Sequence, residues 1–155
     1  MKILSEDKFA ELIIENQNAM YRLAMGILKN NADAEDAVSS SIINAFEHLH
    51  SLKKPEKFKS WIMTIVLNES KAILRRNKRI DLYSDTDIFE KKNHEDDTDI
   101  WQLVLSLDAN FSKVVILYYY EGFSTKEISK ILHISEGTVK SRLSRVRDKL
   151  KIILQ

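Results

Sequence analysis

The hydrophobic positions of this chain recur at helical spacing in its first fifty residues. Between about Ser5 and Lys29 they mark one side of a long helix, which the pair Asn30-Asn31 ends. Its expected buried side chains are Phe9, Leu12, Ile13, Met20, Leu23, Ala24, Ile27 and Leu28. A second helix is predicted from about Asp33 to His50, with a core side formed by Ala37, Val38, Ile42, Ala45, Phe46 and Leu49. Its opposite face is mixed and suits either water or a protein partner. That face is Asp36, Ser40, Ile43 and Glu47.

A third helix is predicted to begin at Phe58, after a loop, Leu52–Ser60, that holds the only proline. Its start, Trp61–Leu67, is apolar on nearly all sides and is expected in the core. Farther along, a polar stripe recurs at spacings of four, three, four and three, through Thr64, Asn68, Lys71, Arg75 and Lys78. Such a stripe suits a nucleic-acid backbone with one base contacted by Asn68, or it is simply a solvated helix end.

The segment Asp81–Asp99 is polar and acidic and lacks periodicity, so it is predicted to be a flexible linker. Beyond it, a short helix is expected over Ile100–Leu107, and another from a cap at Asp108 to Gly122. We therefore predict an all-α fold of two small helical domains, residues 1–80 and 100–155, joined by the linker 81–99.

The stretch Ser124–Leu150 has the pattern of a helix-turn-helix. Ser124 and Glu127 are spaced for a capping box, His133-Ile134 forms the turn, and Ser135 can cap the second helix. In that second helix one apolar stripe is formed by Val139, Leu143, Val146 and Leu150. The opposite side carries Gly137, Thr138, Ser141, Ser144, Arg145 and Asp148, flanked by Lys140, Arg147, Arg142 and Lys149. Small and hydrogen-bonding groups between cations suit the major groove of DNA, and the alternative is a solvated amphipathic helix.

Composition narrows the class of protein. The chain has 155 residues, 44% apolar residues, three Gly and one Pro, which does not favour a sheet protein. There is no Cys, and the longest apolar run, Val114–Tyr120, is too short for a membrane span, so a soluble cytoplasmic protein is expected. Although the net charge is only +1, basic segments at Lys71–Arg79 and Lys140–Lys151 flank the acidic Asp81–Asp99, which indicates two nucleic-acid surfaces.

Enzymatic signals are weak. The pair His48 and His50 lacks further ligands for a metal, and Ser39-Ser40-Ser41 lacks a base and an oxyanion loop. We predict no catalysis and no cofactor.

Taken together, these motifs resemble the sigma factors of bacterial RNA polymerase, in the small two-domain extracytoplasmic-function (ECF) group. In the first domain the matching strings are Tyr21-Arg22-Leu23-Ala24, Asp33-Ala34-Glu35-Asp36-Ala37-Val38 and Phe58-Lys59-Ser60-Trp61, with Asn68 and Arg75-Arg76. In the second they are Glu121-Gly122-Phe123-Ser124, Glu127-Ile128, and Ile134-Ser135-Glu136-Gly137-Thr138-Val139-Lys140-Ser141-Arg142-Leu143. The last string also resembles response-regulator helix-turn-helix domains, whereas both halves in this order are more specific.

The resemblance implies an alternative sigma factor that directs promoter-specific initiation and has no catalytic residue. It implies that the β′ clamp helices of core RNA polymerase bind the face formed by Asp36, Ser40, Ile43 and Glu47. It implies that the minus-ten promoter element meets the Leu52–Ser60 loop, where a flipped base is captured, together with Asn68, Lys71, Arg75, Arg76 and Lys78. It implies that the minus-thirty-five element meets Thr138, Lys140, Ser141, Arg142, Ser144, Arg145, Arg147 and Lys149. The β flap of the polymerase and a dedicated anti-sigma factor are further expected partners, with no membrane insertion.

Two departures from the family pattern stand out. Ser39-Ser40-Ser41 replaces Gln-Glu-Thr, and His133 stands where the turn usually has Gly. His tolerates the left-handed backbone better than most residues, so the turn can survive. The alternative function is a helix-turn-helix regulator that never joins the polymerase. Its receiver domain would alternate strands with helices, whereas residues 1–79 show only helical periodicity.

Overall fold

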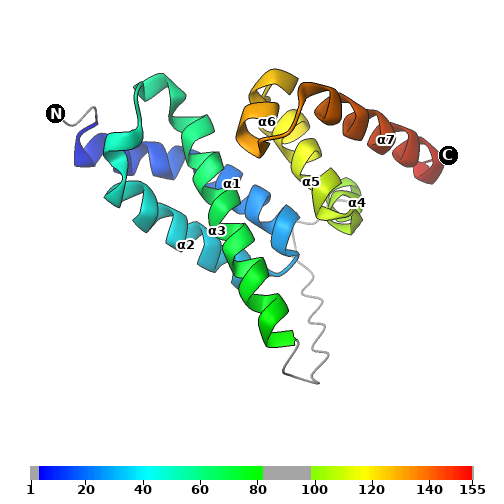
Figure 1. Ribbon diagram of the computed structural model, residues 1–155, viewed down its shortest axis with the longest axis horizontal. Coiled ribbons are helices and arrows are strands. Elements are labelled where there is room, and N and C mark those ends of the chain that lie inside the picture. Colours follow the sequence, from blue (N-terminus) through cyan, green and yellow to red (C-terminus); the bar gives the residue numbers. More distant parts are fainter. Residues whose placement is uncertain (1–3, 82–98, 155) are drawn as a thin grey trace.

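Three long helices form the first half of the protein. The computed structural model describes residues 4–81 and 99–154 (Figure 1). Helix α1 (Glu6–Leu28) is capped by the Ser5 hydroxyl and ends at Lys29, whose left-handed backbone (φ 60°) turns the chain. The Asn30 side chain then caps α2 (Asn31–Glu47). The chain break expected at Asn30-Asn31 thus lies one residue earlier, and Asn31 already belongs to α2.

The second helix ends sooner than expected and a compact loop follows. After Glu47 come two short 3₁₀ turns, η1 (Leu49–Ser51) and η2 (Pro55–Lys57), and then α3 (Phe58–Asp81), which begins where predicted. Two side-chain bonds join α3 to α2, from Asn44 to Glu69 and from Asn77 to Asp33. Both bonds hold α3 along one side, and its opposite side is left for other contacts.

The second half of the protein contains the shorter helices. They are α4 (Asp99–Ser106), α5 (Ala109–Val115), the π-helical turn η3 (Ile116–Tyr120), α6 (Thr125–Leu132) and α7 (Glu136–Leu154). The Asp108 carboxylate caps α5 as predicted, and Gly122 (φ 76°) ends this helical run. The expected linker 81–99 lies outside the described residues except for its two ends, which belong to α3 and α4.

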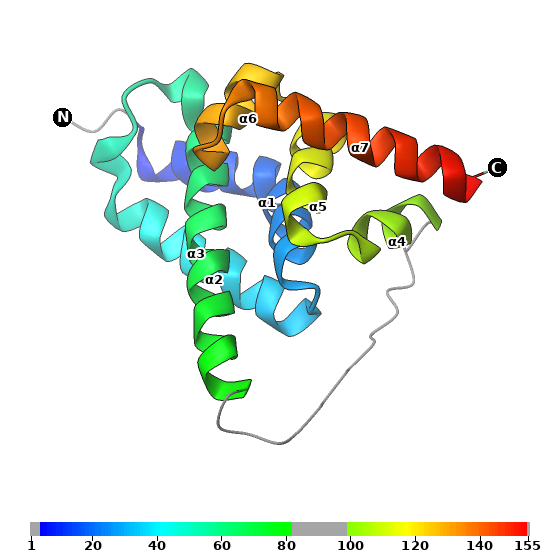
Figure 2. The same ribbon diagram turned by 45° about the vertical axis from the view of Figure 1, so that its right-hand side comes forward.

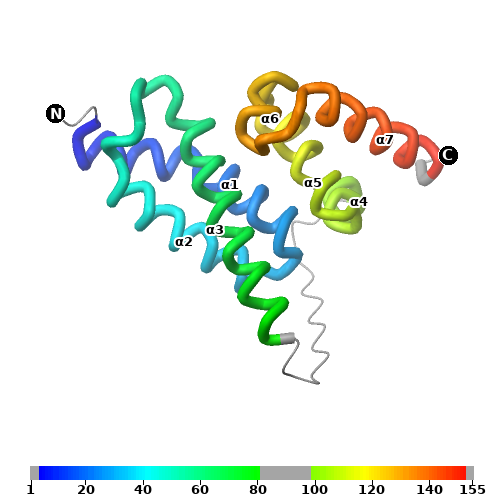
Figure 3. Tube along the Cα trace, viewed as in Figure 1, coloured from blue at the N-terminus to red at the C-terminus, as the bar shows by residue number. Residues whose placement is uncertain are grey.

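Every regular element in the described residues is helical, so the all-α class with two helical units is confirmed. Helices α1, α2 and α3 pack on one another, and α5, α6 and α7 form a second bundle with α4 beside α5 (Figures 1 and 3). The first half has no alternating strands of the kind that a receiver domain requires. The two units also touch, because α5 packs on α1 and α6 packs on α3 (Figure 2). We call this contact the seam.

The core largely follows the predicted periodicity. All the α1 positions predicted to be buried are buried, apart from Leu12, which is half-buried against the core. In α2 the ring of Phe46 was predicted to face the core but is 49% exposed. Phe46 lies at the edge of α2 beside α1, where its ring centroid is 5.7 Å from that of Phe9. The buried face of α2 is directed between α1 and α3, so Phe46 lies at the edge of this face and remains partly in solvent.

Candidate nucleic-acid interface

The turn between α6 and α7 is built by local hydrogen bonds. The Ser124 hydroxyl accepts from the Glu127 amide at 3.1 Å, and the Glu127 carboxylate accepts from the Ser124 amide at 3.0 Å, which completes the predicted capping box. The backbone amide at Ser124 lowers the pKa of Glu127, so its carboxylate remains charged. His133 adopts the left-handed conformation (φ 55°, ψ 44°), and the Ser135 hydroxyl accepts from the Thr138 amide at 3.1 Å to begin α7.

The faces of α7 are sorted as predicted. Val139, Leu143 and Val146 are at most 2% exposed and pack against α5 and α6. Of the eight α7 residues predicted to contact DNA, two are half-buried, Thr138 and Arg142. The six exposed ones are Lys140, Ser141, Ser144, Arg145, Arg147 and Lys149. A helix that buries one side and presents cations around small polar groups on the other has the layout that a major groove accepts.

Two cations of this face already have partners within the protein. Arg147 donates to the Tyr119 hydroxyl at 3.3 Å, which holds its guanidinium toward the end of η3. Lys140 lies 3.6 Å from the Glu136 carboxylate, one turn earlier in α7. Arg145 and Lys149 are exposed on the helix surface. Arg145 thus lies on the side of α7 opposite the buried apolar stripe, where it is accessible to the edge of a DNA base.

The predicted stripe on α3 lies along its solvent side. Asn68, Arg75, Arg76 and Lys78 are exposed, whereas Lys71 is half-buried. Thr64, at the start of the stripe, donates its hydroxyl back to the Ser60 carbonyl at 3.0 Å. Because the bonds to α2 hold the other side of α3, the stripe presents an amide followed by cations along one continuous surface.

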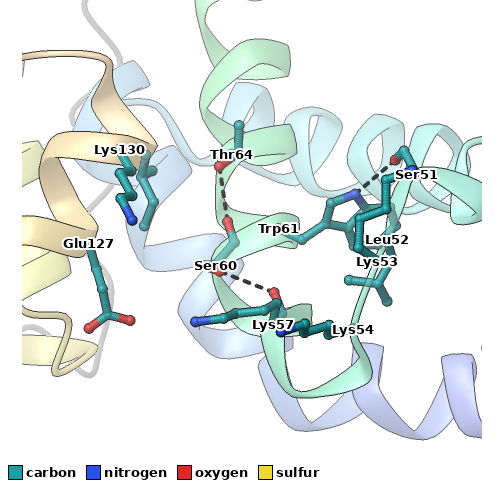
Figure 4. Close-up of a pocket in the computed structure, with 11 residues that line it drawn as sticks. Ser51, Leu52, Lys53, Lys54, Lys57, Ser60, Trp61, Thr64, Glu127 and Lys130 are labelled. Atoms are coloured by element: carbon teal, nitrogen blue, oxygen red, sulfur yellow. Dashed lines mark hydrogen bonds between the residues drawn. The ribbon is translucent and has the colours of Figure 1, made fainter.

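A cavity of about 480 Å³ lies next to this stripe, between the loop before α3 and helix α6 of the second unit. Its wall includes the loop residues Lys53, Lys54 and Lys57, none of which was singled out from the sequence (Figure 4). The Trp61 indole also lines the cavity and donates to the Ser51 hydroxyl at 3.0 Å. An aromatic face beside several amines suits an unpaired base and its phosphates. The lysines flanking Pro55 were the available signal in the sequence.

The predicted polymerase face of α2 is exposed. Asp36, Ser40, Ile43 and Glu47 all lie on the solvent side, and Ile43 is 61% exposed. Phe46, which the sequence placed in the core, is instead a second large apolar side chain near this face. Exposed apolar groups rimmed by carboxylates are typical of a protein-binding surface.

No metal site is found in the part of the chain that the structure describes, since no three His, Asp or Glu side chains lie close enough to hold an ion. The His48 and His50 rings lie 6.0 Å apart, and the His48 Nδ1 atom bonds the Asn44 carbonyl. None of the helices over 4–81 and 99–154 has an apolar stretch long enough to cross a bilayer.

Comparisons with known proteins match both units. The Sigma-70 region 2 family matches residues 12–80, and the Sigma-70, region 4 family matches residues 98–150. RNA polymerase sigma factor SigV of Bacillus subtilis (strain 168) is 33% identical over 146 residues, covering 92% of this chain and 88% of SigV. ECF RNA polymerase sigma factor SigW of the same organism is 27% identical, over 94% of this chain and 88% of SigW.

Two solved structures share the fold. Sigma factor RpoE from Bartonella quintana, in complex with the anti-sigma factor NepR, matches with a TM-score of 0.82 and 26% identity, over 95% of this chain and 96% of that one. CnrH, in complex with the cytosolic domain of CnrY, matches with a TM-score of 0.70 and 22% identity, over 97% and 89% of the two chains. With both regions matched in order and the exposed cationic faces on α3 and α7, the chain belongs to the ECF group of bacterial RNA polymerase sigma factors, alternative sigma factors that direct transcription.

Proposed function

We propose that this sigma factor joins core RNA polymerase through the exposed face of α2 and contacts the promoter at two elements. The β′ clamp helices bind Asp36, Ser40, Ile43 and Glu47, with Phe46 adding apolar area at the rim. In the same proposal the β flap contacts the second unit. The factor works by binding alone, in the bacterial cytoplasm, without a catalytic residue or a cofactor.

The minus-ten element is assigned to α3 and the adjoining cavity. A flipped base enters the cavity beside the Trp61 ring, where stacking on an aromatic face contributes about 1–3 kcal/mol per base. Asn68 then offers an amide donor and acceptor to a base edge, and Lys57 faces the backbone from the loop. Lys71, Arg75, Arg76 and Lys78 follow the phosphates along the helix.

The minus-thirty-five element is assigned to α7. One observation carries the whole proposal: α7 has two distinct faces. Three apolar residues are buried on one face, and six predicted DNA-contact residues are exposed on the rest of the helix. Arg145 lies centrally on the groove face and is the candidate for bidentate contact with guanine. Lys140, Arg147 and Lys149 are assigned to phosphates, with Thr138, Ser141, Arg142 and Ser144 completing the face.

An anti-sigma factor is the proposed regulator. The similarity to RpoE in its complex with NepR extends over nearly the whole of both chains, so the two units are arranged much as in a sigma factor held by its inhibitor. The exposed apolar side chains Ile14 and Ile152, 72% and 76% exposed, are further available to a protein partner.

The test is a pull-down with purified core polymerase, followed by transcription from a promoter that depends on this factor. The double variant Asp36→Lys/Glu47→Lys should weaken core binding while helix content stays unchanged, because charges at an interface rim change association most. A matched control is Glu11→Lys/Glu15→Lys, which reverses two exposed carboxylates on α1. Equal binding by both double variants would move the polymerase contact away from α2. A chain that binds promoter DNA but not core polymerase would instead be a conventional regulator.

A further inference from the structure

A buried ion pair joins the two units at the seam. The Arg22 guanidinium in α1 contacts the Glu121 carboxylate with two of its nitrogens, at 2.7 Å from Nη2 to Oε1 and 3.2 Å from Nε to Oε2. The Glu121 side chain is 2% exposed and that of Arg22 is 33% exposed. A charged, two-point contact of this kind is strong and directional, and a carboxylate so deeply buried depends on its partner.

The backbone delivers Glu121 to this position. The π-helical turn η3 widens the end of the α5 segment, and the Glu121 amide bonds the Ile116 carbonyl at 3.0 Å. From α3, the Lys59 amine donates to the Glu121 carbonyl at 3.0 Å and lies 5.5 Å from the centre of the Phe123 ring. Residue 121 is therefore held by α1 through its side chain and by α3 through its backbone.

A second set of contacts lies at the other end of the seam. The Ser112 hydroxyl donates to the Gly26 carbonyl at 2.9 Å, and the Lys29 amine donates to Ser112 Oγ at 3.0 Å and to the Leu107 carbonyl at 2.8 Å. A Cβ atom at Gly26 would lie 2.3 Å from Ile116 Cδ1, so the end of the Ile116 side chain occupies the space beside this glycine. The seam is thus a specific, packed interface and not a loose contact.

This packing covers the surface assigned to the minus-ten element. Glu127, Lys130 and Ile131 of α6 form one wall of the cavity that holds Trp61 (Figure 4). Figure 4 shows the Lys57 amine pointing across the cavity toward the Glu127 carboxylate, and that charge contributes to the lowered pKa of Glu127. The Glu127 carboxylate therefore faces Lys57, the loop cation that a DNA phosphate would contact in the proposed complex. The cavity is narrowed and partly neutralised by the second unit.

The packed state also keeps the two DNA faces close together. Burial, then Lys71 and Arg142, lower the pKa of Lys113 in α5. The α3 cation Lys71 and the α7 cation Arg142 therefore both act electrostatically on this one amine of α5.

We infer that Arg22 and Glu121 form a latch that keeps the free chain in this closed state, with α6 across the base-capture cavity, and that the latch must open before the factor can initiate transcription. The inference rests on the proposed function for its consequence, but the latch itself is a property of the free chain. Across the same seam, Lys71 of α3 repels Lys113 of α5. This repulsion opposes the attraction of the Arg22–Glu121 pair.

The opening can be measured by the reactivity of a thiol placed in the seam. The natural chain has no cysteine, so Ser112→Cys introduces a single buried thiol at the contact with Gly26. When opening and closing are fast, its reaction with a disulfide reagent proceeds in proportion to the open population. Glu121→Gln keeps the size of the side chain and removes its charge, and should speed the reaction roughly tenfold, since a charge-assisted pair becomes a weaker neutral one.

Two controls separate latch opening from general destabilisation. Glu11→Gln removes a carboxylate from the exposed pair with Lys8 and should leave the reaction within about twofold, as surface pairs contribute little. A thiol at Ser41→Cys, buried in α2 away from the seam, should react at the same rate with and without Glu121→Gln. If Glu121→Gln leaves the seam thiol unchanged, or speeds both thiols equally, there is no latch.

Core polymerase supplies the second readout. If only open chains bind, the apparent Kd falls by the factor by which the open population rises, so Glu121→Gln should bind core polymerase roughly tenfold more tightly than the natural chain. Faster seam labelling with unchanged polymerase affinity would overturn the inhibitory role of the latch. If no variant binds polymerase, the proposed function fails, while the labelling result still decides whether the latch exists.

Discussion

The turn of the helix-turn-helix offers a direct test of how the backbone is stabilised, through the substitution His133→Gly. His133 has φ 55° and ψ 44°, and its amide bonds the Ser129 carbonyl at the end of α6. The following amide, of Ile134, bonds the same carbonyl at 3.1 Å. The His133 side chain is exposed, so its removal deletes no buried contact.

The expected gain follows from two opposing terms. A residue with a Cβ atom in the left-handed region costs about 1–2 kcal/mol, which glycine avoids. Glycine in turn loses more conformational entropy on folding than a residue with a Cβ atom, which costs roughly 0.5–1 kcal/mol. His133→Gly should therefore raise the free energy of unfolding by about 0.5–1 kcal/mol, which corresponds to a rise in Tm of about 1–4 °C for a chain of this size.

Urea denaturation followed by circular dichroism measures this change. The midpoint should move to higher urea while the m-value stays constant, since the surface exposed on unfolding is the same. His133→Ala is the matched control, because it removes the imidazole but keeps the Cβ atom, and it should show no gain. If the Gly and Ala variants are equally stable, the left-handed backbone at this position carries no measurable cost and the reasoning is refuted.

Three further predictions concern DNA contacts and pH. Arg145→Ala should relax the preference at one position of the minus-thirty-five element by ~1–3 kcal/mol, whereas Lys149→Ala should weaken all promoters alike and reduce the salt slope by about one. Holoenzyme binding to single-base promoter variants at several salt concentrations measures both, and a uniform loss for Arg145→Ala would contradict the assigned groove face. Asn68→Ala should slow open-complex formation on a duplex promoter, and a smaller transcription defect should remain on a pre-melted template. Normal transcription from both templates would mean that Asn68 is a surface residue without a role in base contact. Burial lowers the pKa of Lys29 from 10.5 to about 8, so between these values the unfolded chain binds more protons and the free energy of unfolding should rise with pH. Lys29→Met should make that rise smaller by about 1–2 kcal/mol after solvent screening, in urea titrations at pH 8 and pH 10. Identical changes in both proteins would contradict the lowered pKa of Lys29.

The helix-turn-helix could be predicted from the sequence because its determinants are local. The Ser124–Glu127 box and the Ser135 cap each join groups three residues apart, so the bonds seen in the structure depend on residue type and spacing alone. The apolar stripe of α7 follows from the helical period in the same way. The left-handed turn at His133 was also expected, because the related sigma factors usually have Gly there and His tolerates this backbone better than most residues.

Other features depended on where whole helices lie. Periodicity predicted the apolar side of α2, but not that its edge would leave Phe46 49% exposed, since the positions of α1 and α3 decide which part of that side is covered. The loop lysines around Pro55 gained a role only when α3 placed Trp61 beside them.

The seam is the clearest case of a feature that only the tertiary structure decided. Arg22 and Glu121 both stand in recognisable sequence motifs, yet they are 99 residues apart and neither motif indicates a partner for the other. Their pairing requires the π-helical turn at η3 and the packing of α5 on α1. Hydrogen bonds within a helix or turn are specified by neighbouring residues, whereas a contact between separate units depends on the summed packing of both. No local pattern in the chain encodes that sum.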